Sequence, residues 1–200
     1  MVALAAQKIE FQEAVSDEEL MLAVQKGDRE AFGQIVRRYQ EDALRLAYHY
    51  VHNWEDARDL TQDAFVKVYS QANRYDAMQP FRPWFFRILV NHVLNHLSRK
   101  KKIRFSSIFR KQDGGQETNL LDGYVDDRQP EEDLLSRQLV WSALKKLPKN
   151  HRNVLILREL EGLPEQEVAQ ILGCSIGTVK SRLHYAKRKM RHLLAEELNK

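Results

Sequence analysis

Residues 175–189 carry the side chains needed to read DNA. A helix drawn over this segment and on to Leu194 gathers its apolar residues on one arc, formed by Ile176, Val179, Leu183, Ala186, Met190 and Leu193. The opposite face holds Ser181, His184 and Arg188, flanked by Gly177, Lys180 and Tyr185. Hydroxyls, imidazoles and cations of this kind donate hydrogen bonds to base edges and phosphates in a major groove. A solvated basic face is the alternative interpretation.

The segment just before this helix favours the DNA interpretation. LPEQEVAQILGCS fits a short helix followed by Gly173, which can adopt the positive φ of a tight turn. Ser175 can then cap the longer helix. Two helices joined in this way form a helix-turn-helix, whose second helix enters the major groove. Cys174, in the turn, is expected to be a small core residue and not a reactive thiol.

A second candidate surface lies on a helix predicted to include Pro83 in its first turn and to end near Lys102. Its core face is formed by Phe86, Leu89, Val90, Val93 and Leu97. The other side aligns an aromatic, an aliphatic, two amides and two cations: Trp84, Ile88, Asn91, Asn95, Arg99 and Lys102. Single-stranded bases stack on aromatic side chains for about 1–3 kcal/mol each, and cations pair with phosphates. The alternative is a core tryptophan beside solvated asparagines.

The predicted third helix has an acidic outer arc, formed by Asp59, Gln62, Asp63 and Val66. Its buried arc is Ala57, Leu60, Ala64, Phe65 and Val68. An acidic face does not bind DNA. The pattern alone favours a solvated surface, with a protein-docking surface as the alternative.

These helices belong to an all-α chain. Pro and Gly are sparse in 200 residues, and good helix formers abound. Ser16 with Glu19 forms a capping-box pattern, and Asp28 and Asn53 can cap the second and third helices. We expect two small domains, an N-terminal helical bundle and a C-terminal helix-turn-helix domain, joined by a flexible linker. The predicted ranges are 1–15 for an N-terminal tail, 16–102, 103–130 for the linker, and 131–200.

Charge alternates along the chain and suggests separate surfaces for separate partners. The net charge is +7 over residues 99–112, −7 over 113–136 and +7 over 137–200. Basic blocks suit phosphate, although they can also simply be solvated. The N-terminus lacks a secretory signal, no apolar run approaches a membrane span, and the single cysteine excludes an internal disulfide. We therefore expect a cytoplasmic protein with no membrane insertion.

The C-terminal motif resembles a known family. LPKNHRNVLILRELEGLPEQEVAQILGCSIGTVKSRLHYAKRKM is similar to the C-terminal domain of bacterial sigma factors of the extracytoplasmic-function group, whose recognition helix binds the −35 promoter element. The resemblance implies −35 contacts by Lys180, Ser181, His184 and Tyr185; the candidate surface also includes Ser175, Thr178, Arg182 and Arg188. Tyr185 replaces an Arg that is common in the family.

Two motifs in the first domain extend the resemblance. FRPWFFRILVNHVLN is similar to the family's −10-binding helix, and RYDAMQP occupies the place where the family captures a flipped −10 base. The candidate −10 residues are Tyr75, Phe81, Trp84, Ile88, Asn91, Asn95, Arg99 and Lys102. Pro83 stands where Ser or Thr is commoner. DLTQDAFVKVYSQA resembles the motif that docks on the clamp helices of the largest polymerase subunit, which implies core binding by Asp59, Leu60, Gln62, Asp63, Phe65 and Val66.

The resemblance implies a sigma factor. Such a protein binds core RNA polymerase, recognises −35 duplex DNA, and melts and captures the −10 element of the promoter. It is held silent by an anti-sigma factor, and nucleotidyl transfer belongs to the polymerase. We expect no catalytic residue and no cofactor.

Two other classes of protein compete with this interpretation. A helix-turn-helix regulator with a helical sensor domain would bind duplex DNA without polymerase, but it has no reason to carry the motif at 59–72. A metal enzyme is suggested only by His92 and His96, spaced i, i+4 as in zinc proteases. Val93 stands where those proteases place Glu, and no third ligand is evident, so we expect no metal.

Overall fold

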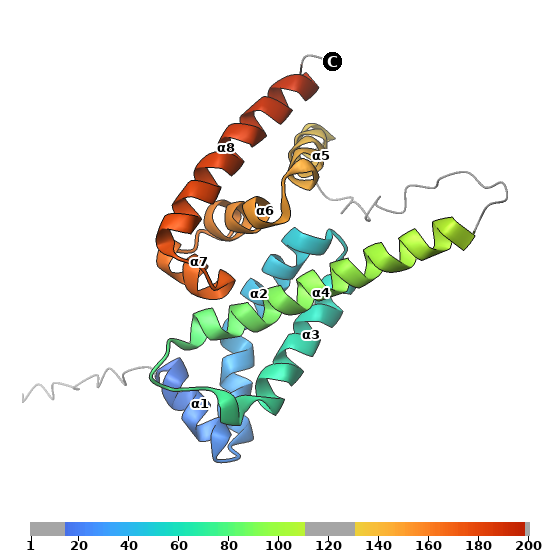
Figure 1. Ribbon diagram of the computed structural model, residues 1–200. Helices are drawn as coiled ribbons and strands as arrows, with labels where there is room; N and C mark the ends of the chain where they lie inside the picture. The colour runs from blue at the N-terminus through green and yellow to red at the C-terminus, as the bar shows by residue number, and fades with distance from the viewer. Residues whose placement is uncertain (1–14, 111–130, 199–200) are drawn as a thin grey trace, which may run out of the picture.

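The computed structural model describes residues 15–110 and 131–198, and every regular element in these two ranges is helical (Figure 1). The first half contains α1 (Asp17–Gln25), α2 (Arg29–Val51), α3 (Trp54–Ser70), the 3₁₀ turn η1 (Ala72–Arg74) and α4 (Phe81–Arg110). The second half contains α5 (Glu131–Lys146), α6 (Lys149–Leu155), the π turn η2 (Ile156–Leu160), α7 (Glu165–Leu172) and α8 (Ile176–Leu198). The expected all-helical class is confirmed. Most of the predicted tail and most of the predicted linker lie outside the described residues.

The first three helices begin at the predicted caps. Ser16 Oγ accepts a hydrogen bond from the backbone N–H of Glu19, whose carboxylate accepts one from Ser16 N at 2.9 Å. Asp28 accepts from two backbone amides in the first turn of α2. Asn53 Oδ1 accepts from the N–H of the third residue of α3 at 2.9 Å. Each cap satisfies backbone donors that the helix itself leaves free.

Aromatic rings fill the core of the first half. Phe81 and Phe85 are fully buried, and the Tyr39 ring packs against them with centroids 5.2 and 5.4 Å away. The Phe65 ring of α3 stacks on Phe85 at 5.0 Å. The first residue of α4 is also held from α1, because Phe81 N donates to Glu18 Oε1 at 2.9 Å. These contacts fix α4 against α2 and α3.

Helix α4 is longer than the sequence predicts. We expected it to end near Lys102, but it continues to Arg110. Part of the predicted linker is therefore helical. The physical reason is visible in the chain: residues 84–113 contain neither Pro nor Gly, so no local breaker stops the helix before Gly114.

The second half has a smaller, aliphatic core and the expected helix-turn-helix. Helices α5, α6 and α8 bury one cluster: Ala143, Leu144, Leu147, Leu155, Ala186, Met190 and Leu193. Gly173 has φ +62 at the end of α7, and Ser175 Oγ accepts from Thr178 N at 3.1 Å, as predicted. The turn glycine and the cap together set the direction of α8.

The two halves lie against each other. Helix α7 packs along the start of α4 (Figure 1). The π turn η2 contacts α2. Buried apolar residues of α6, η2 and α7 join the same cluster as the aromatic core of the first half. Within the described ranges, no helix is both long and apolar enough to cross a lipid bilayer.

Candidate protein and nucleic-acid interfaces

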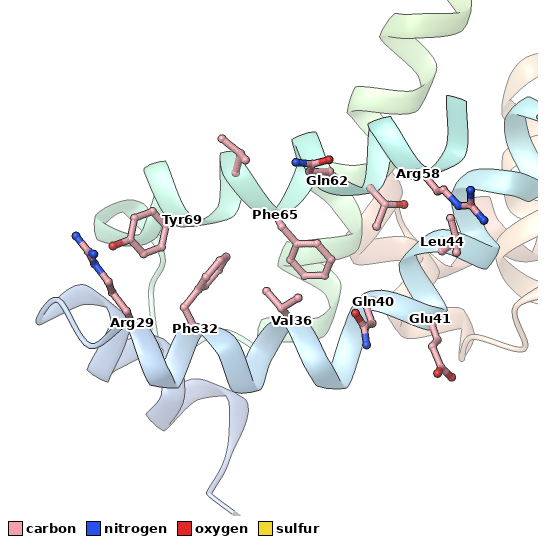
Figure 2. A pocket seen from close by; sticks show the side chains of 12 residues that line it. Arg29, Phe32, Val36, Gln40, Glu41, Leu44, Arg58, Gln62, Phe65 and Tyr69 are labelled. Carbon is pink, nitrogen blue, oxygen red and sulfur yellow. The ribbon is translucent and has the colours of Figure 1, made fainter. Parts of the chain in front are cut away.

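An apolar groove of about 760 Å³ runs between α2 and α3 (Figure 2). We call it the α2–α3 groove; its lining is Arg29, Phe32, Val36, Gln40, Glu41, Leu44, Arg58, Thr61, Gln62, Phe65, Val66 and Tyr69. The Phe32, Val36 and Phe65 side chains point into the groove between the two helices, and the charged side chains Arg29, Glu41 and Arg58 stand toward its ends. A groove of this size and composition suits apolar side chains of a protein partner.

Three of the six residues assigned to polymerase docking line this groove: Gln62, Phe65 and Val66. Val66 is 61% exposed, which is unusual for an aliphatic side chain in a helix that also packs on a core. Asp59 and Asp63 are exposed on the same helix. Leu60 and Phe65 are 3% and 7% exposed, as expected for the predicted buried arc, and both belong to the core beneath the groove.

Sequence reasoning missed the half of the groove that comes from α2. Phe32, Val36 and Leu44 all line the groove and are only partly buried. The Phe32 ring packs against Tyr69 of α3 with centroids 5.0 Å apart. Helical periodicity places these apolar residues on one face of α2, but it does not show that part of each side chain is left uncovered by the other helices.

The histidines considered as a metal pair instead face α3 acids. His92 Nε2 lies 3.0 Å from Asp63 Oδ2, and His92 Nδ1 also contacts the Lys67 amine. His96 Nε2 lies 3.7 Å from Asp56, which Lys100 approaches to 2.6 Å. Burial, and then the charge of Lys100, lowers the pKa of His96. Among residues 15–110 and 131–198, no three His, Cys, Asp or Glu side chains are placed to hold a metal ion.

The candidate −10 stripe forms an exposed line along α4. Asn91, Asn95, Arg99 and Lys102 are exposed, and Trp84 and Ile88 are half-buried. The Trp84 ring packs on Tyr75 and Phe81 with centroids 4.9 and 5.9 Å away. The Tyr75 and Phe81 rings therefore hold the indole in place. The exposed asparagines and cations lie farther along the same stripe of α4.

Tyr75 and Phe81 are corrections, because both are buried. Phe81 is 0% exposed, and Tyr75 is 4% exposed with its hydroxyl donating to Gln79 O at 2.6 Å. Their rings lie beneath Trp84 and hold it, so they support the surface and cannot contact DNA in this conformation. The loop before α4 instead exposes Met78, at 87%. No residue pattern had singled out this side chain.

The candidate −35 surface is exposed along α8. Ser175, Lys180, Ser181, His184, Tyr185 and Arg188 are exposed, and Thr178 and Arg182 are half-buried. Lys180 Nζ lies 3.7 Å from Glu165, and the guanidinium of Arg188 lies over the Tyr185 ring. Ile176 was expected on the apolar arc, but it is 42% exposed. It stands at the first position of α8, beyond the core of the second half.

Comparison with known proteins places both halves in one family. Residues 35–103 match the family model "Sigma-70 region 2", and residues 137–190 match "Sigma-70, region 4". The RNA polymerase sigma-H factor of Pseudomonas aeruginosa is 32% identical over 178 residues, covering 86% of this chain and 90% of that protein. The ECF RNA polymerase sigma-E factor of Escherichia coli K12 is 35% identical over 180 residues, covering 88% and 92%.

A solved structure is similar over both halves. The structure of CnrH in complex with the cytosolic domain of CnrY matches with a TM-score of 0.66 and 26% identity, covering 91% of this chain and 99% of that one. The sigma factor RpoE of Bartonella quintana, solved with the anti-sigma factor NepR, shares the fold at 23% identity and a TM-score of 0.60, covering 82% and 96%.

Proposed function

The chain belongs to the extracytoplasmic-function family of RNA polymerase sigma factors, and we propose which of its surfaces perform each task. The first half binds core RNA polymerase and the separated −10 strand, and the second half binds the −35 duplex. Residues 16–102 and 131–200 are the proposed domains for these tasks. The chain directs transcription initiation in the cytoplasm, and nucleotidyl transfer is carried out by the polymerase.

Polymerase docking is assigned to the α2–α3 groove and the acidic edge of α3. The single observation that supports this assignment most is Val66, an aliphatic side chain 61% exposed at the rim of an apolar groove. The Thr61 hydroxyl adds to it, because Thr61 is 7% exposed, lines the groove, and has no hydrogen-bond partner among the described residues. A docked helix of the polymerase clamp would cover Val66 and supply that partner.

Promoter binding is assigned to two different chemistries. The α8 face offers Lys180, Ser181, His184 and Arg188 to the edges and phosphates of duplex DNA. The α4 stripe offers the Trp84 ring for base stacking, two asparagines for base edges, and cations for the backbone. The buried Tyr75 and Phe81 rings lie beneath this stripe and hold Trp84 in place.

We extend the proposal to an anti-sigma partner. CnrH was solved with the cytosolic domain of CnrY, and the RpoE of Bartonella quintana was solved with the anti-sigma factor NepR. By similarity to CnrH, a protein of this kind would keep the present chain silent.

The test is a comparison of two variants in binding and transcription with purified core polymerase. Val66→Asp places a charge where apolar contact is proposed, so affinity for core should fall about 100-fold. Val15→Asp is the matched control, because Val15 is also exposed, at 47%, but lies before α1 and outside the groove. Unchanged core affinity of Val66→Asp would overturn the docking assignment.

Asn91→Ala separates DNA capture from docking. Asn91 is exposed on α4 and is not part of the groove. Open-complex formation on run-off templates should fall about 10-fold, as expected for loss of one base contact, while core affinity stays unchanged. Equal loss of both activities would contradict the assignment.

A further inference from the structure

One carboxylate of the proposed docking edge is held by a histidine of the neighbouring helix. His92 Nε2 of α4 lies 3.0 Å from Oδ2 of Asp63 on α3. The other ring nitrogen, Nδ1, contacts the amine of Lys67, which follows Asp63 by one turn of α3. The His92 side chain is 15% exposed, and the Asp63 side chain is 63% exposed. The ring is therefore placed between an acid and a base of α3, and the acid still faces solvent.

The order of these three groups fixes the position of the proton on the ring. A lysine ammonium carries hydrogen-bond donors and no acceptor, so His92 Nδ1 must accept from Lys67. A neutral imidazole has one acceptor nitrogen and one N–H, which places the proton on Nε2. Nε2 then donates to Asp63 Oδ2. The three side chains form a directed series of hydrogen bonds that starts and ends on α3.

The acid and the base would otherwise be natural partners for each other. Asp63 and Lys67 are spaced i, i+4 with the acid first, an arrangement in which opposite charges attract on a helix surface. In the described part of the chain, Lys67 nevertheless forms no ion pair with Asp63 or with another carboxylate. The His92 ring contacts both side chains and takes the place of their direct pair. Asp63 therefore keeps its negative charge available to a partner.

We infer that His92 is a positioning residue for polymerase docking, which orients the Asp63 carboxylate and keeps it from pairing with Lys67. The inference rests on the proposed function, which assigns Asp63 to the docking edge. Gln62 and Val66 lie on either side of Asp63 in the sequence and line the α2–α3 groove, so a partner seated in the groove comes close to this carboxylate.

The chemistry of Asp63 specifies what the partner must offer. Among the described residues, its second oxygen, Oδ1, has no hydrogen-bond donor. An ammonium or guanidinium of core polymerase fits this oxygen, because hydrogen bonds between ionised groups are stronger than those between neutral ones. A carboxylate that is already oriented by His92 also loses less side-chain freedom when the contact forms.

The other histidine of α4 supplies a matched control. His96 Nε2 lies 3.7 Å from Asp56 in the first turn of α3, beyond hydrogen-bond distance, and Lys100 pairs with Asp56 directly at 2.6 Å. At this position the acid is paired with its lysine, and the ring does not separate them. Asp56 does not line the groove. His96→Phe therefore changes a histidine of the same helix without altering the contacts of Asp63.

The test measures the affinity of the full-length chain for purified core polymerase. His92→Phe keeps a flat ring but removes both ring nitrogens, so Lys67 and Asp63 are free to pair. Core affinity should fall about 5-fold, the amount by which an exposed ion pair can compete for the carboxylate. Combining His92→Phe with Lys67→Met should restore most of the affinity, because the competing cation is gone. His96→Phe should bind core as the wild type does.

A merely structural role for His92 predicts a different result. Loss of packing between α3 and α4 would weaken His92→Phe and the double variant alike, since Lys67→Met does not restore the missing ring. Equal weakness of these two variants overturns the inference, and so does wild-type affinity of His92→Phe. Urea unfolding followed by circular dichroism verifies that each variant is folded in the binding assay.

The hydrogen-bond series is also tested in the wild-type protein, without any substitution. Nitrogen-15 chemical shifts of histidine rings distinguish a proton on Nε2 from a proton on Nδ1. In the free full-length chain at mildly alkaline pH, His92 should carry its proton on Nε2. A neutral ring with the proton on Nδ1 overturns the inference, even if His92→Phe fails to fold.

Asp63→Asn separates failure of this inference from failure of the proposed function. It removes the carboxylate charge itself, so core affinity should fall at least as far as in His92→Phe. If Val66→Asp loses affinity and Asp63→Asn does not, the proposed docking groove stands and the inference alone is overturned. If the wild-type chain does not bind core, the proposed function and the inference both fail.

Discussion

The cores of the two halves are built from different side chains. In the first half, aromatic rings from α2, α3 and α4 contact one another, as Tyr39, Phe65, Phe81 and Phe85 show. In the second half, the cluster shared by α5, α6 and α8 contains alanine, leucine and methionine. Large rings bury more apolar surface per residue than aliphatic side chains do. The first half therefore has the means to hold α4 rigidly by itself.

The second half, by contrast, shares much of its packing with the first. Val154, Ile156, Leu157, Val168 and Ile171 are all buried in the cluster that contains the aromatic core. A helix-turn-helix with a small core of its own can move as a unit, but it loses apolar contacts when it leaves α4. The comparison indicates one stable platform and one dependent module.

The largest expected effect is the loss of stability caused by a substitution in the core of the first half. Phe85→Ala removes a ring that is 0% exposed and touches four other aromatic side chains, so it should lower the free energy of unfolding by about 3–5 kcal/mol. Leu144→Ala, in the smaller core, should cost about 2–3 kcal/mol. Urea unfolding followed by circular dichroism measures both. A larger loss for Leu144→Ala would break the comparison.

An effect of intermediate size on stability is expected from the protonation of His52, which packs on Trp141 at the boundary between the halves. Burial, followed by the charge of Lys145, lowers the pKa of His52 to about 4, below the ordinary value of 6.5. Between pH 6.5 and 4 the unfolded chain binds a proton that the folded chain does not, so stability falls as pH falls. From pH 7 to 5 the loss attributable to His52 should be about 2 kcal/mol.

His52→Asn is the variant that isolates this titration. His52 has φ +52, a left-handed conformation that asparagine tolerates well. The variant should show a flatter dependence of unfolding free energy on pH between 7 and 5. His96, whose pKa is also lowered, remains in both proteins and cancels in the difference. Identical pH profiles would show that His52 is not the titrating group.

The smallest effect is expected on the exposed face of α8. Ser181→Ala should alter the preference for one −35 position by about 1–2 kcal/mol, and leave core affinity and stability unchanged. In the free chain its hydroxyl donates to Thr178 O at 3.1 Å, so it must rotate to reach a base. Ser70→Ala is the control, because Ser70 donates to Lys67 O in the same way on α3. An equal shift by both variants in promoter-binding assays would contradict the assignment.

The sequence by itself determined the features that depend on near neighbours in the chain. The caps at Ser16, Asp28 and Asn53 and the turn at Gly173 arise from hydrogen bonds and backbone angles within a few residues. The exposed stripes on α4 and α8 follow from helical period once the apolar face is known. The outer arc of residues 59–72 follows from the same period, but its docking role was predicted only from the resemblance to the family's polymerase-binding motif.

Only the tertiary structure decided which faces are covered and by what. Phe81 is buried against the Tyr39 ring of α2, and Tyr75 against the Phe81 and Trp84 rings of α4. Phe32 packs on Tyr69 of α3 and lines the groove. Glu161 meets α2 across more than one hundred residues. The type of an apolar or charged residue predicts that it will be buried or paired. Which residue it contacts depends on how the helices pack together, and its position along the chain does not specify this.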